Sequence, residues 1–379
     1  MSSPSSKRRR LARRFTERKV DDVRIDEIAP LLPPACLMEE LPITETIADE
    51  VSSTRHAIAN VLSREDDRLI VVVGPCSIHD TKACKEYALK LRKLKEELSN
   101  DLVIVMRIYF EKPRTTVGWK GLINDPELDG SFKINTGLRR ARKFLLDVNE
   151  LGLPAAVEFL DTISPQFIAD LVSWGAIGAR TTESQCHREL ASGLSCPVGF
   201  KNGTGGDIKV AADAILSSSR PHSFLSVTKH GLAAIVHTKG NPNCHVILRG
   251  GKSGTNYDAK SVANVQAMLA KANIPDAGIM IDCSHGNSKK IHTNQPIVAA
   301  SVGEQIAAGN SSIVGVMIES HINEGNQKLN PGVTLLRDLK YAVSVTDACI
   351  NIDTTKEVLR NLAKSVRDRR ARVKTNGKA

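Results

Sequence analysis

Residues 69–77 read LIVVVGPCS and contain the clearest strand signal in the chain. Five apolar residues follow one another without polar alternation and stop at a Gly-Pro pair, directly before Cys76. Uninterrupted apolar runs of this length are typical of strands that are covered on both faces of a parallel sheet. Seven later runs share this character, namely 102–108, 155–159, 176–179, 198–200, 246–248, 279–281 and 313–318.

Longer segments with helical spacing of apolar residues separate these runs, for example 81–98, 164–173, 261–272 and 295–308. Alternating strand and helix segments build either a doubly wound sheet or a closed barrel. Eight strand segments favour the barrel, and the first run lacks the G-x-G-x-x-G turn of a dinucleotide-binding sheet. We therefore predict an α/β protein with a (β/α)8 TIM barrel.

Two segments exceed a minimal barrel of this kind. Residues 20–60 precede the first strand and are predicted to form an N-terminal extension with a regulatory or interface role. Residues 222–245 contain two short apolar runs, 224–227 and 233–237, which predict an inserted β-hairpin before the sixth barrel strand. The catalytic barrel itself is assigned to residues 61–379, with this insertion.

The net charge of +10 is concentrated at the two ends of the chain. Residues 1–19 carry eight basic side chains against one acidic one, and residues 356–379 carry nine against two. These ends together hold +14, so the body between them is close to −4 and offers no basic platform for nucleic acid. We predict that 1–19 is a disordered basic tail and that 354–373 is an amphipathic helix.

Composition argues against several other classes of protein. The sequence contains neither an apolar run long enough for a transmembrane helix nor the apolar core of a secretory signal. The eight cysteines are scattered without C-x-x-C pairs, which indicates reduced thiols rather than a disulfide framework. We expect a cytoplasmic enzyme with no membrane and no nucleic-acid partner, although the basic tail also fits organelle targeting.

Each predicted strand ends at a residue with charged or reactive chemistry. In chain order these residues are Cys76, Arg107, Glu158, Arg180, Lys201, Arg249, Asp282 with His285, and Glu319 with His321. The carboxyl ends of barrel strands converge on one face, where the active sites of this fold lie. Eight such ends in register predict one shared site, because isolated buried charges are costly.

The predicted site is strongly cationic. Its basic side chains are Arg107, Lys112, Arg114, Arg180, Lys201 and Arg249. So many cations in one cavity need anionic ligands, and phosphates or carboxylates meet that need. Cys76, His285, Glu319 and a later acid suit a first-row divalent metal better than Mg or Ca. A buried cysteine is also often inert, so both interpretations of Cys76 are open on residue type alone.

Seven segments resemble type I 3-deoxy-D-arabino-heptulosonate-7-phosphate (DAHP) synthases, the feedback-regulated class of that family. They are 74–80 (GPCSIHD), 107–121 (RIYFEKPRTTVGWKG), 178–185 (GARTTESQ), 199–203 (GFKNG), 247–251 (ILRGG), 282–285 (DCSH) and 319–327 (ESHINEGNQ). The main alternative is a relative that joins phosphoenolpyruvate to another sugar, such as a KDO 8-phosphate or sialic acid synthase. The KPRTT motif and the long N-terminal extension argue against that alternative.

The resemblance implies condensation of phosphoenolpyruvate with erythrose 4-phosphate to DAHP and phosphate, the first step of the shikimate pathway. It implies a divalent metal, Mn2+ first and otherwise Fe2+, Co2+ or Zn2+, with the ligands Cys76, His285, Glu319 and Asp347. The residues implied for phosphoenolpyruvate are Arg107, Lys112, Glu158, Arg180, Lys201 and Arg249, and those for the aldose phosphate are Arg114 and Thr115. The implied catalytic residues are Lys112, Arg107, Cys76 and His285. The alkoxide proton would come from Lys112 or from a water on the metal.

Feedback inhibition by an aromatic amino acid is implied as well. The positions that match the effector site of the family are Asp22, Pro165, Gln166, Leu194, Ser195, Phe224 and Ser226. In the family, serine at the position of Ser226 accompanies phenylalanine, and glycine accompanies tyrosine. A serine hydroxyl would occupy the space that the hydroxyl of tyrosine needs, so phenylalanine is the expected effector, with tyrosine and tryptophan as alternatives. A homodimer or homotetramer is expected.

Overall fold

The structure is a computed structural model that describes residues 20–114, 118–330, 332–334 and 336–376. The chain divides into two compact units, Met1–Leu32 and Pro33–Ala379. The predicted tail 1–19 lies outside the described residues, so the structure does not bear on it. In the first unit, the amide of Ile25 donates a hydrogen bond to the carbonyl of Asp22 at 3.2 Å and closes a turn.

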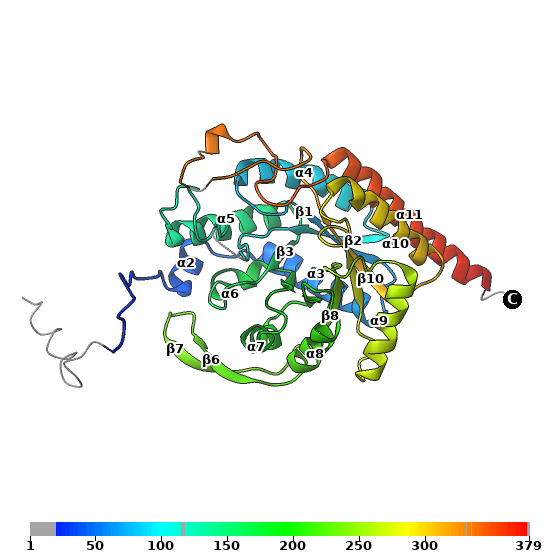
Figure 1. The fold of residues 1–379 in the computed structure, drawn as a ribbon, viewed down its shortest axis with the longest axis horizontal. Coiled ribbons are helices and arrows are strands. Elements are labelled where there is room, and N and C mark those ends of the chain that lie inside the picture. The colour runs from blue at the N-terminus through cyan, green and yellow to red at the C-terminus, as the bar shows by residue number, and fades with distance from the viewer. Residues whose placement is uncertain (1–19, 115–117, 331, 335, 377–379) are drawn as a thin grey trace, which may run out of the picture. The chain divides into compact units, whose positions relative to one another are not determined.

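The second unit is built around a closed parallel barrel (Figure 1). Its strands are β1 (Leu69–Gly74), β2 (Leu102–Arg107), β3 (Ala155–Glu158), β4 (Trp174–Ile177), β5 (Val198–Lys201), β8 (Cys244–Leu248), β9 (Ile279–Asp282) and β10 (Ile313–Glu319). Neighbouring strands pair in parallel all the way round, and β10 closes the barrel against β1. The predicted (β/α)8 TIM barrel is confirmed, and every strand residue is buried, as the unbroken apolar runs indicated.

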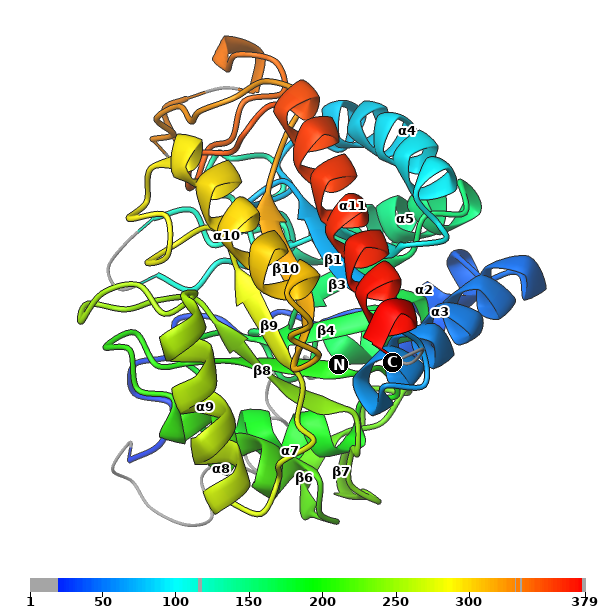
Figure 2. The ribbon, with the colours of Figure 1, turned by 90° about the vertical axis from the view of Figure 1, so that its right-hand side faces the viewer.

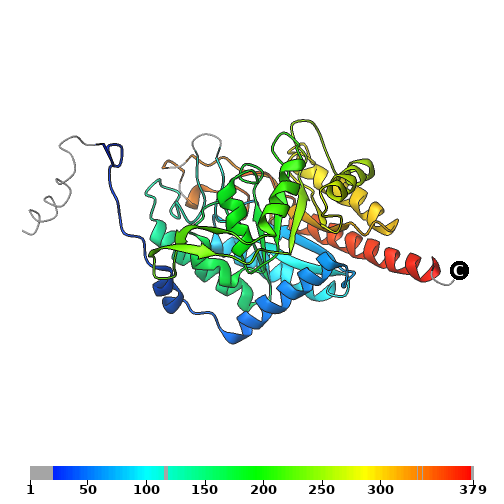
Figure 3. The same ribbon diagram turned by 90° about the horizontal axis from the view of Figure 1, so that it is seen from below.

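Helices connect the strands, cover the outside of the barrel and, before the first strand, close its amino-terminal end. They are α2 (Pro34–Glu40), α3 (Glu45–Ser63), α4 (Thr81–Glu97), α5 (Ile134–Glu150), α6 (Pro165–Ile168), α7 (Gln185–Gly193), α8 (Lys209–Ser218), α9 (Ala259–Lys271), α10 (Gln295–Ala307) and α11 (Ile352–Asn376). Figure 2 shows α10 and α11 side by side outside β10. In Figure 3 the last turns of α11 project past the barrel. No helix among the described residues has the length and apolar character needed to cross a membrane.

The amino-terminal end of the barrel is closed by α3. Ile58, Val61 and Leu62 of this helix belong to the same buried cluster as Ile70 of β1 and Val103 of β2. Burial of several aliphatic side chains at about 2 kcal/mol each makes this plug a major source of stability. The opposite, carboxyl-terminal end of the barrel carries the polar strand ends.

The helix that follows β1 begins at a strong cap. The carboxylate of Asp80 accepts hydrogen bonds from the amides of Lys82 and Ala83, at 2.9 and 3.2 Å. Such a cap satisfies amides that the first helical turn leaves unpaired, and its removal costs about 1 kcal/mol. The cap holds the short loop between β1 and α4, which carries Cys76.

The predicted inserted hairpin is present. It consists of β6 (Ser223–Val227) and β7 (Ala233–His237), which pair in antiparallel register as a separate two-stranded sheet before β8. The carbonyl of Lys229, in its turn, accepts a hydrogen bond from the amide of Ala35 in α2 at 2.7 Å. The insertion therefore contacts the part of the N-terminal extension that precedes the barrel.

Two element predictions differ from the structure. The helix predicted over 164–173 is broken into the four-residue α6 and a 3-10 turn at Ala169–Leu171. At this break Arg142 donates to the carbonyl of Phe167 and Arg55 to that of Ala169, each at 2.8 Å, so side chains from other helices pair with carbonyls here. The strand predicted over 176–179 begins two residues earlier, at Trp174, since Gly175 weakened its signal in the sequence.

Candidate active site

A cavity of about 320 Å³ opens at the carboxyl ends of the strands. The residues that line it are Arg107, Lys112, Pro113, Arg114, Glu158, Gly178, Ala179, Arg180, Lys201, Thr204, Arg249, His285, Lys290, Thr346 and Asp347. All six cations that the sequence grouped together therefore face one space. Of the residues expected around the aldose phosphate, Arg114 is among them and Thr115 lies outside the described residues.

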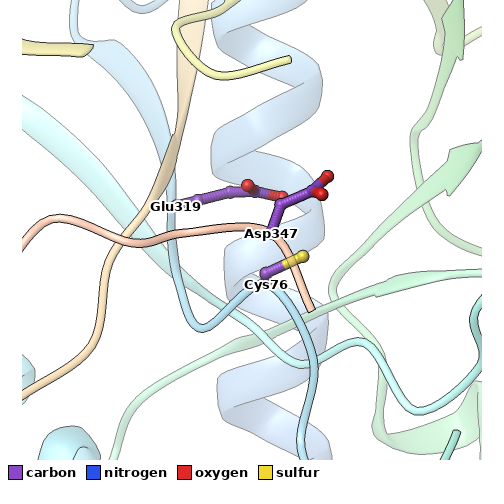
Figure 4. A group of neighbouring side chains, drawn as sticks. All are labelled: Cys76, Glu319 and Asp347. Atoms are coloured by element: carbon purple, nitrogen blue, oxygen red, sulfur yellow. The ribbon is translucent and has the colours of Figure 1, made fainter. Parts of the chain in front are cut away.

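Three potential metal ligands meet beside this cavity (Figure 4). Cys76 follows β1, Glu319 ends β10, and Asp347 lies in the loop before α11, and one ligand atom from each lies within 4.8 Å of the others. Barrel closure brings the first two together, because Gly74 of β1 pairs with Glu319 of β10. Residues separated by more than two hundred positions in the chain thus form one cluster.

His285 approaches the cluster from β9. Its Nε2 lies 3.8 Å from Oε1 of Glu319, and its Nδ1 lies 2.8 Å from Oδ2 of the fully buried Asp282. Burial opposes ionisation of Asp282, yet the contact with His285 holds the pKa of that carboxyl well below its usual range. The hydroxyl of Ser284, whose Oγ lies 2.6 Å from the same Nδ1, and the nearby carboxylate fix the orientation of the imidazole and leave the other nitrogen to face a metal.

The environment of Cys76 tests whether a metal fits. Burial, and then the charge of Glu319, raises the pKa of the Cys76 thiol, so the thiol is neutral without a nearby dication. The Nζ of Lys112 lies 3.3 Å from its Sγ and partly opposes this effect. A thiol, an imidazole and two carboxylates form a donor set that first-row divalent ions favour, and such an ion would displace the thiol proton. The residues therefore fit a divalent metal.

Arg107 joins the cation-rich cavity to the ligand cluster. Its guanidinium is completely buried and donates to Oε1 of Glu319 at 3.0 Å and to the carbonyl of Cys76 at 3.2 Å. A third hydrogen bond reaches the carbonyl of Pro75 at 3.2 Å. Nη1 also lies 3.2 Å from Sδ of Met317, so these contacts hold the guanidinium in one orientation at the wall of the cavity, where its charge attracts an anion.

Glu158 and Lys201 form a second buried pair, at 2.8 Å. Burial alone would raise the pKa of Glu158, but Lys201 and then Lys112 outweigh that effect and bring the pKa to about 2. Glu158 is therefore a carboxylate at neutral pH and is not a proton donor there. It compensates part of the positive charge of the cavity.

Two further cations, Arg114 and Arg249, are held by main-chain contacts. Nε of Arg114 donates to the carbonyl of Trp119 at 2.8 Å, and Nη1 of Arg249 donates to the carbonyl of Gly250 at 3.3 Å. The amide of Arg249 donates to Oδ1 of Asn202 at 2.8 Å, which ties the end of β8 to the end of β5. Contacts to carbonyls position these guanidinium groups without cancelling their charge.

Sequence reasoning missed some residues of the site. Lys290 and Thr346 line the cavity, and Oγ1 of Thr346 lies 2.8 Å from Oγ of Ser77. Two adjacent lysines after β9 were a possible sequence signal for Lys290. They lie several residues beyond the end of the strand, however, and the prediction considered only residues close to the strand ends. The role of Asp282 in holding His285 was not predicted either, although Asp282 was noted as a strand end.

The residues expected to bind an effector lie on several elements. Pro165 and Gln166 begin α6, Leu194 and Ser195 follow α7, and Phe224 and Ser226 lie on β6. One contact joins the hairpin to α6, because Nζ of Lys229 in the hairpin turn donates to the carbonyl of Gln166 at 2.5 Å. Asp22 belongs to the first compact unit.

A cation-rich cavity next to a thiol, imidazole and carboxylate cluster, at the carboxyl end of a (β/α)8 barrel, defines a class of enzyme that handles phosphorylated anions beside a metal. Comparison with known proteins narrows this class. Residues 43–360 match the model of the DAHP synthetase I family. The chain belongs to this family.

Similar proteins carry names from the same family. The chain is 62% identical over 350 residues to the Phe-sensitive phospho-2-dehydro-3-deoxyheptonate aldolase of Escherichia coli, covering 92% of this chain and 98% of that protein. It is 57% identical to the tyrosine-inhibited enzyme of Schizosaccharomyces pombe, with 96% and 97% covered. A solved structure from Francisella tularensis has a TM-score of 0.88 and 52% identity, covering 91% of this chain and 99% of that one.

Proposed function

We propose that this chain condenses phosphoenolpyruvate with erythrose 4-phosphate to give DAHP and phosphate. The observation that carries the proposal is the presence of six cations around one cavity, with the potential metal ligands Cys76, Glu319 and Asp347 clustered beside it. Two phosphate groups and one carboxylate bring up to five negative charges, so a cavity with this excess of cations suits both substrates.

We assign the cations to the two substrates as the resemblance to the family implies. Arg107 and Lys201, which are buried deep in the cavity, bind the phosphate and carboxylate of phosphoenolpyruvate together with Lys112, Arg180 and Arg249. Arg114, which is more exposed, binds the phosphate of the aldose with Thr115. Glu158 assists the first substrate through water, as its carboxylate is already paired with Lys201.

The reaction requires two bonds to form and one carbon–oxygen bond to break. When bound, the divalent ion supplies Lewis-acid polarisation of the aldehyde oxygen. The enol carbon attacks the aldehyde carbon, water adds to the neighbouring carbon, and phosphate leaves with the electrons of the carbon–oxygen bond. The cations hold the two substrates in attack geometry and stabilise the departing phosphate.

Lys112 is the proposed proton donor to the new alkoxide. Its Nζ lies 3.3 Å from Sγ of Cys76 and so sits at the edge of the ligand cluster. Burial lowers the pKa of Lys112, but Cys76 and Glu319 outweigh this and raise it, which keeps the ammonium charged. A charged ammonium beside the aldehyde oxygen can both attract the developing anion and deliver the proton.

The ligands proposed for the metal are Cys76, His285, Glu319 and Asp347, and the proposed ion is Mn2+, with Fe2+, Co2+ and Zn2+ as alternatives. The mixed donor set supports a first-row ion over Mg or Ca. The pKa of Asp347 is lowered by His285 and Lys112 although burial opposes this, so the carboxylate is ionised and ready to bind a cation.

A direct assay tests this function. Purified protein would be mixed with phosphoenolpyruvate and erythrose 4-phosphate, and phosphate release would be measured with EDTA, after EDTA removal, and after addition of Mn2+. We expect phosphate release to need both the sugar phosphate and the metal. Release without erythrose 4-phosphate, or full activity in EDTA, would contradict the proposal.

Feedback inhibition by phenylalanine is part of the proposal. It is supported by the relatives from Escherichia coli and Saccharomyces cerevisiae, which are named Phe-sensitive and phenylalanine-inhibited, and by the serine at position 226. The tyrosine-inhibited relative from Schizosaccharomyces pombe makes tyrosine the main competitor. Inhibition assays with phenylalanine, tyrosine and tryptophan decide between them, and Ser226→Gly should shift the response from phenylalanine toward tyrosine.

A further inference from the structure

One aromatic ring lies beneath three of the cations that line the active-site cavity. Tyr109 follows β2 by two residues and is completely buried. The Cζ atom of Arg107 lies over this ring, 3.6 Å from its centroid. The Nζ atoms of Lys201 and Lys112 also lie over it, at 5.5 and 6.0 Å.

Three cations this close together repel one another. Glu319 and Glu158 offset part of the charge, at 3.0 Å from Arg107 and 2.8 Å from Lys201. A further carboxylate would hold the cations more firmly, but it would also compete with the anionic substrate for them. An aromatic ring attracts cations through its quadrupole and carries no net charge, so it stabilises the cluster and leaves its charge available.

The contacts of Tyr109 indicate that its ring, rather than its hydroxyl, stabilises the cluster of cations. The hydroxyl lies 3.9 Å from the sulfur of Met317, which is a weak acceptor. The ring belongs to the buried cluster that fills the barrel beneath the cavity, together with Val105 and Ala156. Packing on that side leaves the face of the ring fixed below Arg107.

We propose that Tyr109 is a positioning residue for phosphoenolpyruvate, because its ring holds Arg107, and at longer range Lys201 and Lys112, in the arrangement that receives the anion. The inference rests on the proposed function of the cavity. It predicts that the ring acts on substrate affinity through the cations and takes no part in bond making or breaking.

A pair of replacements separates the ring from the hydroxyl. Tyr109→Phe should leave the Kd and KM for phosphoenolpyruvate within about twofold of the wild type, since the ring is kept. Tyr109→Leu should raise both constants by about tenfold, with kcat and the affinity for Mn2+ changed by less than about threefold. Equal losses in Tyr109→Phe and Tyr109→Leu would overturn the proposal.

Fluorinated phenylalanines at position 109 test the electrostatic cause without changing the shape much. Fluorine withdraws negative charge from the ring face and so weakens its attraction for cations. The Kd for phosphoenolpyruvate should therefore rise from phenylalanine to 4-fluorophenylalanine and again to 3,4,5-trifluorophenylalanine, with a total increase of about threefold or more. The matched control is the same series at Phe144, a buried ring in α5 that packs edge-to-face on Phe110. There the Kd should stay constant.

Two failures can be told apart by this design. A Kd that stays flat across the series at position 109, in protein whose wild type binds phosphoenolpyruvate, overturns the role of Tyr109 alone. A wild type that shows neither binding of phosphoenolpyruvate nor turnover overturns the proposed function. Thermal unfolding of each variant completes the test, because a merely structural ring would lower Tm in Tyr109→Leu and leave the Kd unchanged.

Discussion

Cys76 combines two properties that conflict in the absence of a cation. It is completely buried, and a carboxylate and an ammonium both lie close to it. Buried thiols are usually neutral and inert, whereas metal ligands must be thiolates. The role proposed for Cys76 as a metal ligand therefore depends on a dication that makes the thiolate form favourable.

Replacement of this thiol should separate metal binding from folding. In Cys76→Ala we expect the affinity for Mn2+ to fall by more than about 100-fold, since one ligand of the cluster is lost. The free energy of unfolding should fall by only about 1 kcal/mol, the cost of one small buried group. Competition with a chromogenic chelator measures the affinity, and urea unfolding measures the stability.

The control for that variant is Cys196→Ala, which removes a buried thiol away from the cavity. It should keep full affinity for Mn2+. Retention of wild-type affinity in Cys76→Ala itself would remove Cys76 from the ligand set.

Glu111 is a buried acid next to Lys112 in the sequence. Its carboxylate accepts hydrogen bonds from the hydroxyl of Ser164 at 2.8 Å and from the amide of Asp161 at 3.3 Å. Burial raises the pKa of Glu111 to about 7. A raised carboxyl pKa stabilises the fold below the unfolded value of 4.5, and this contribution is lost as pH rises to about 7.

The variant Glu111→Gln removes this titration. We expect the stability of the wild type, relative to the variant, to fall by roughly 3 kcal/mol between pH 4.5 and pH 8, because the shift spans about 2.5 pH units. Urea unfolding of both proteins across this range measures the difference. A difference that is independent of pH would mean that Glu111 titrates at its ordinary value.

At the scale of elements, the loop after β2 is closed like a short hairpin. Glu111 pairs with Gly121 in an antiparallel bridge, and the amide of Lys112 donates to the carbonyl of Lys120 at 2.9 Å. Gly121 has a φ of +113°, and a Cβ atom there would lie 1.9 Å from the carbonyl oxygen of Phe110. The main chain that carries Lys112 and Arg114 therefore depends on a glycine at this position.

Gly121→Ala should distort this loop. We expect a loss of stability of about 3 kcal/mol from the clash and the strained backbone, and a KM for erythrose 4-phosphate raised by at least tenfold. Steady-state kinetics and urea unfolding measure the two effects. The control is Gly130→Ala, whose φ of +75° carries strain but whose Cβ would meet nothing within 4 Å. It should lose less stability and keep its KM.

The barrel and the polar strand ends could be predicted because each is indicated by a few consecutive residues in the sequence. A strand buried on both faces is apolar throughout, and its last residue marks the catalytic face. Features that depend on distant residues could not be predicted in this way. Tyr109 lies within an apolar run and looks like core, and Asp282 looks like one more strand end until its distance to His285 is known. The break between α6 and the 3-10 turn after it likewise required Arg55 and Arg142, which come from other helices.

At the scale of the whole molecule, the inserted hairpin presents an apolar face. Leu225 and Ile235 are paired residues of β6 and β7, so their side chains lie on the same side of the sheet, and they are 87% and 67% exposed. Exposed apolar side chains that cluster in this way mark interaction surfaces. A second copy of the chain is the expected partner for this face in a homodimer or homotetramer.

Charged residues at this face should weaken that assembly. We expect the double variant Leu225→Glu, Ile235→Glu to form a smaller species in light scattering after size exclusion. Its dissociation constant should be at least about tenfold higher than that of the wild type. Ile297→Glu, at an exposed apolar residue of α10, should leave the mass unchanged. An unchanged mass in the double variant would place the subunit interface elsewhere.

The pairing of β1 with β10 also has a consequence for the order in which the protein matures. Cys76 leaves the ribosome early, with the first strand, while Glu319 and Asp347 are among the last parts of the barrel to be made. The proposed metal-ligand set therefore stays incomplete until the final strand docks against the first one. A nascent or truncated chain can hold much of the anion-binding cavity and still be unable to start the chemistry, which ties metal loading to completion of the ring.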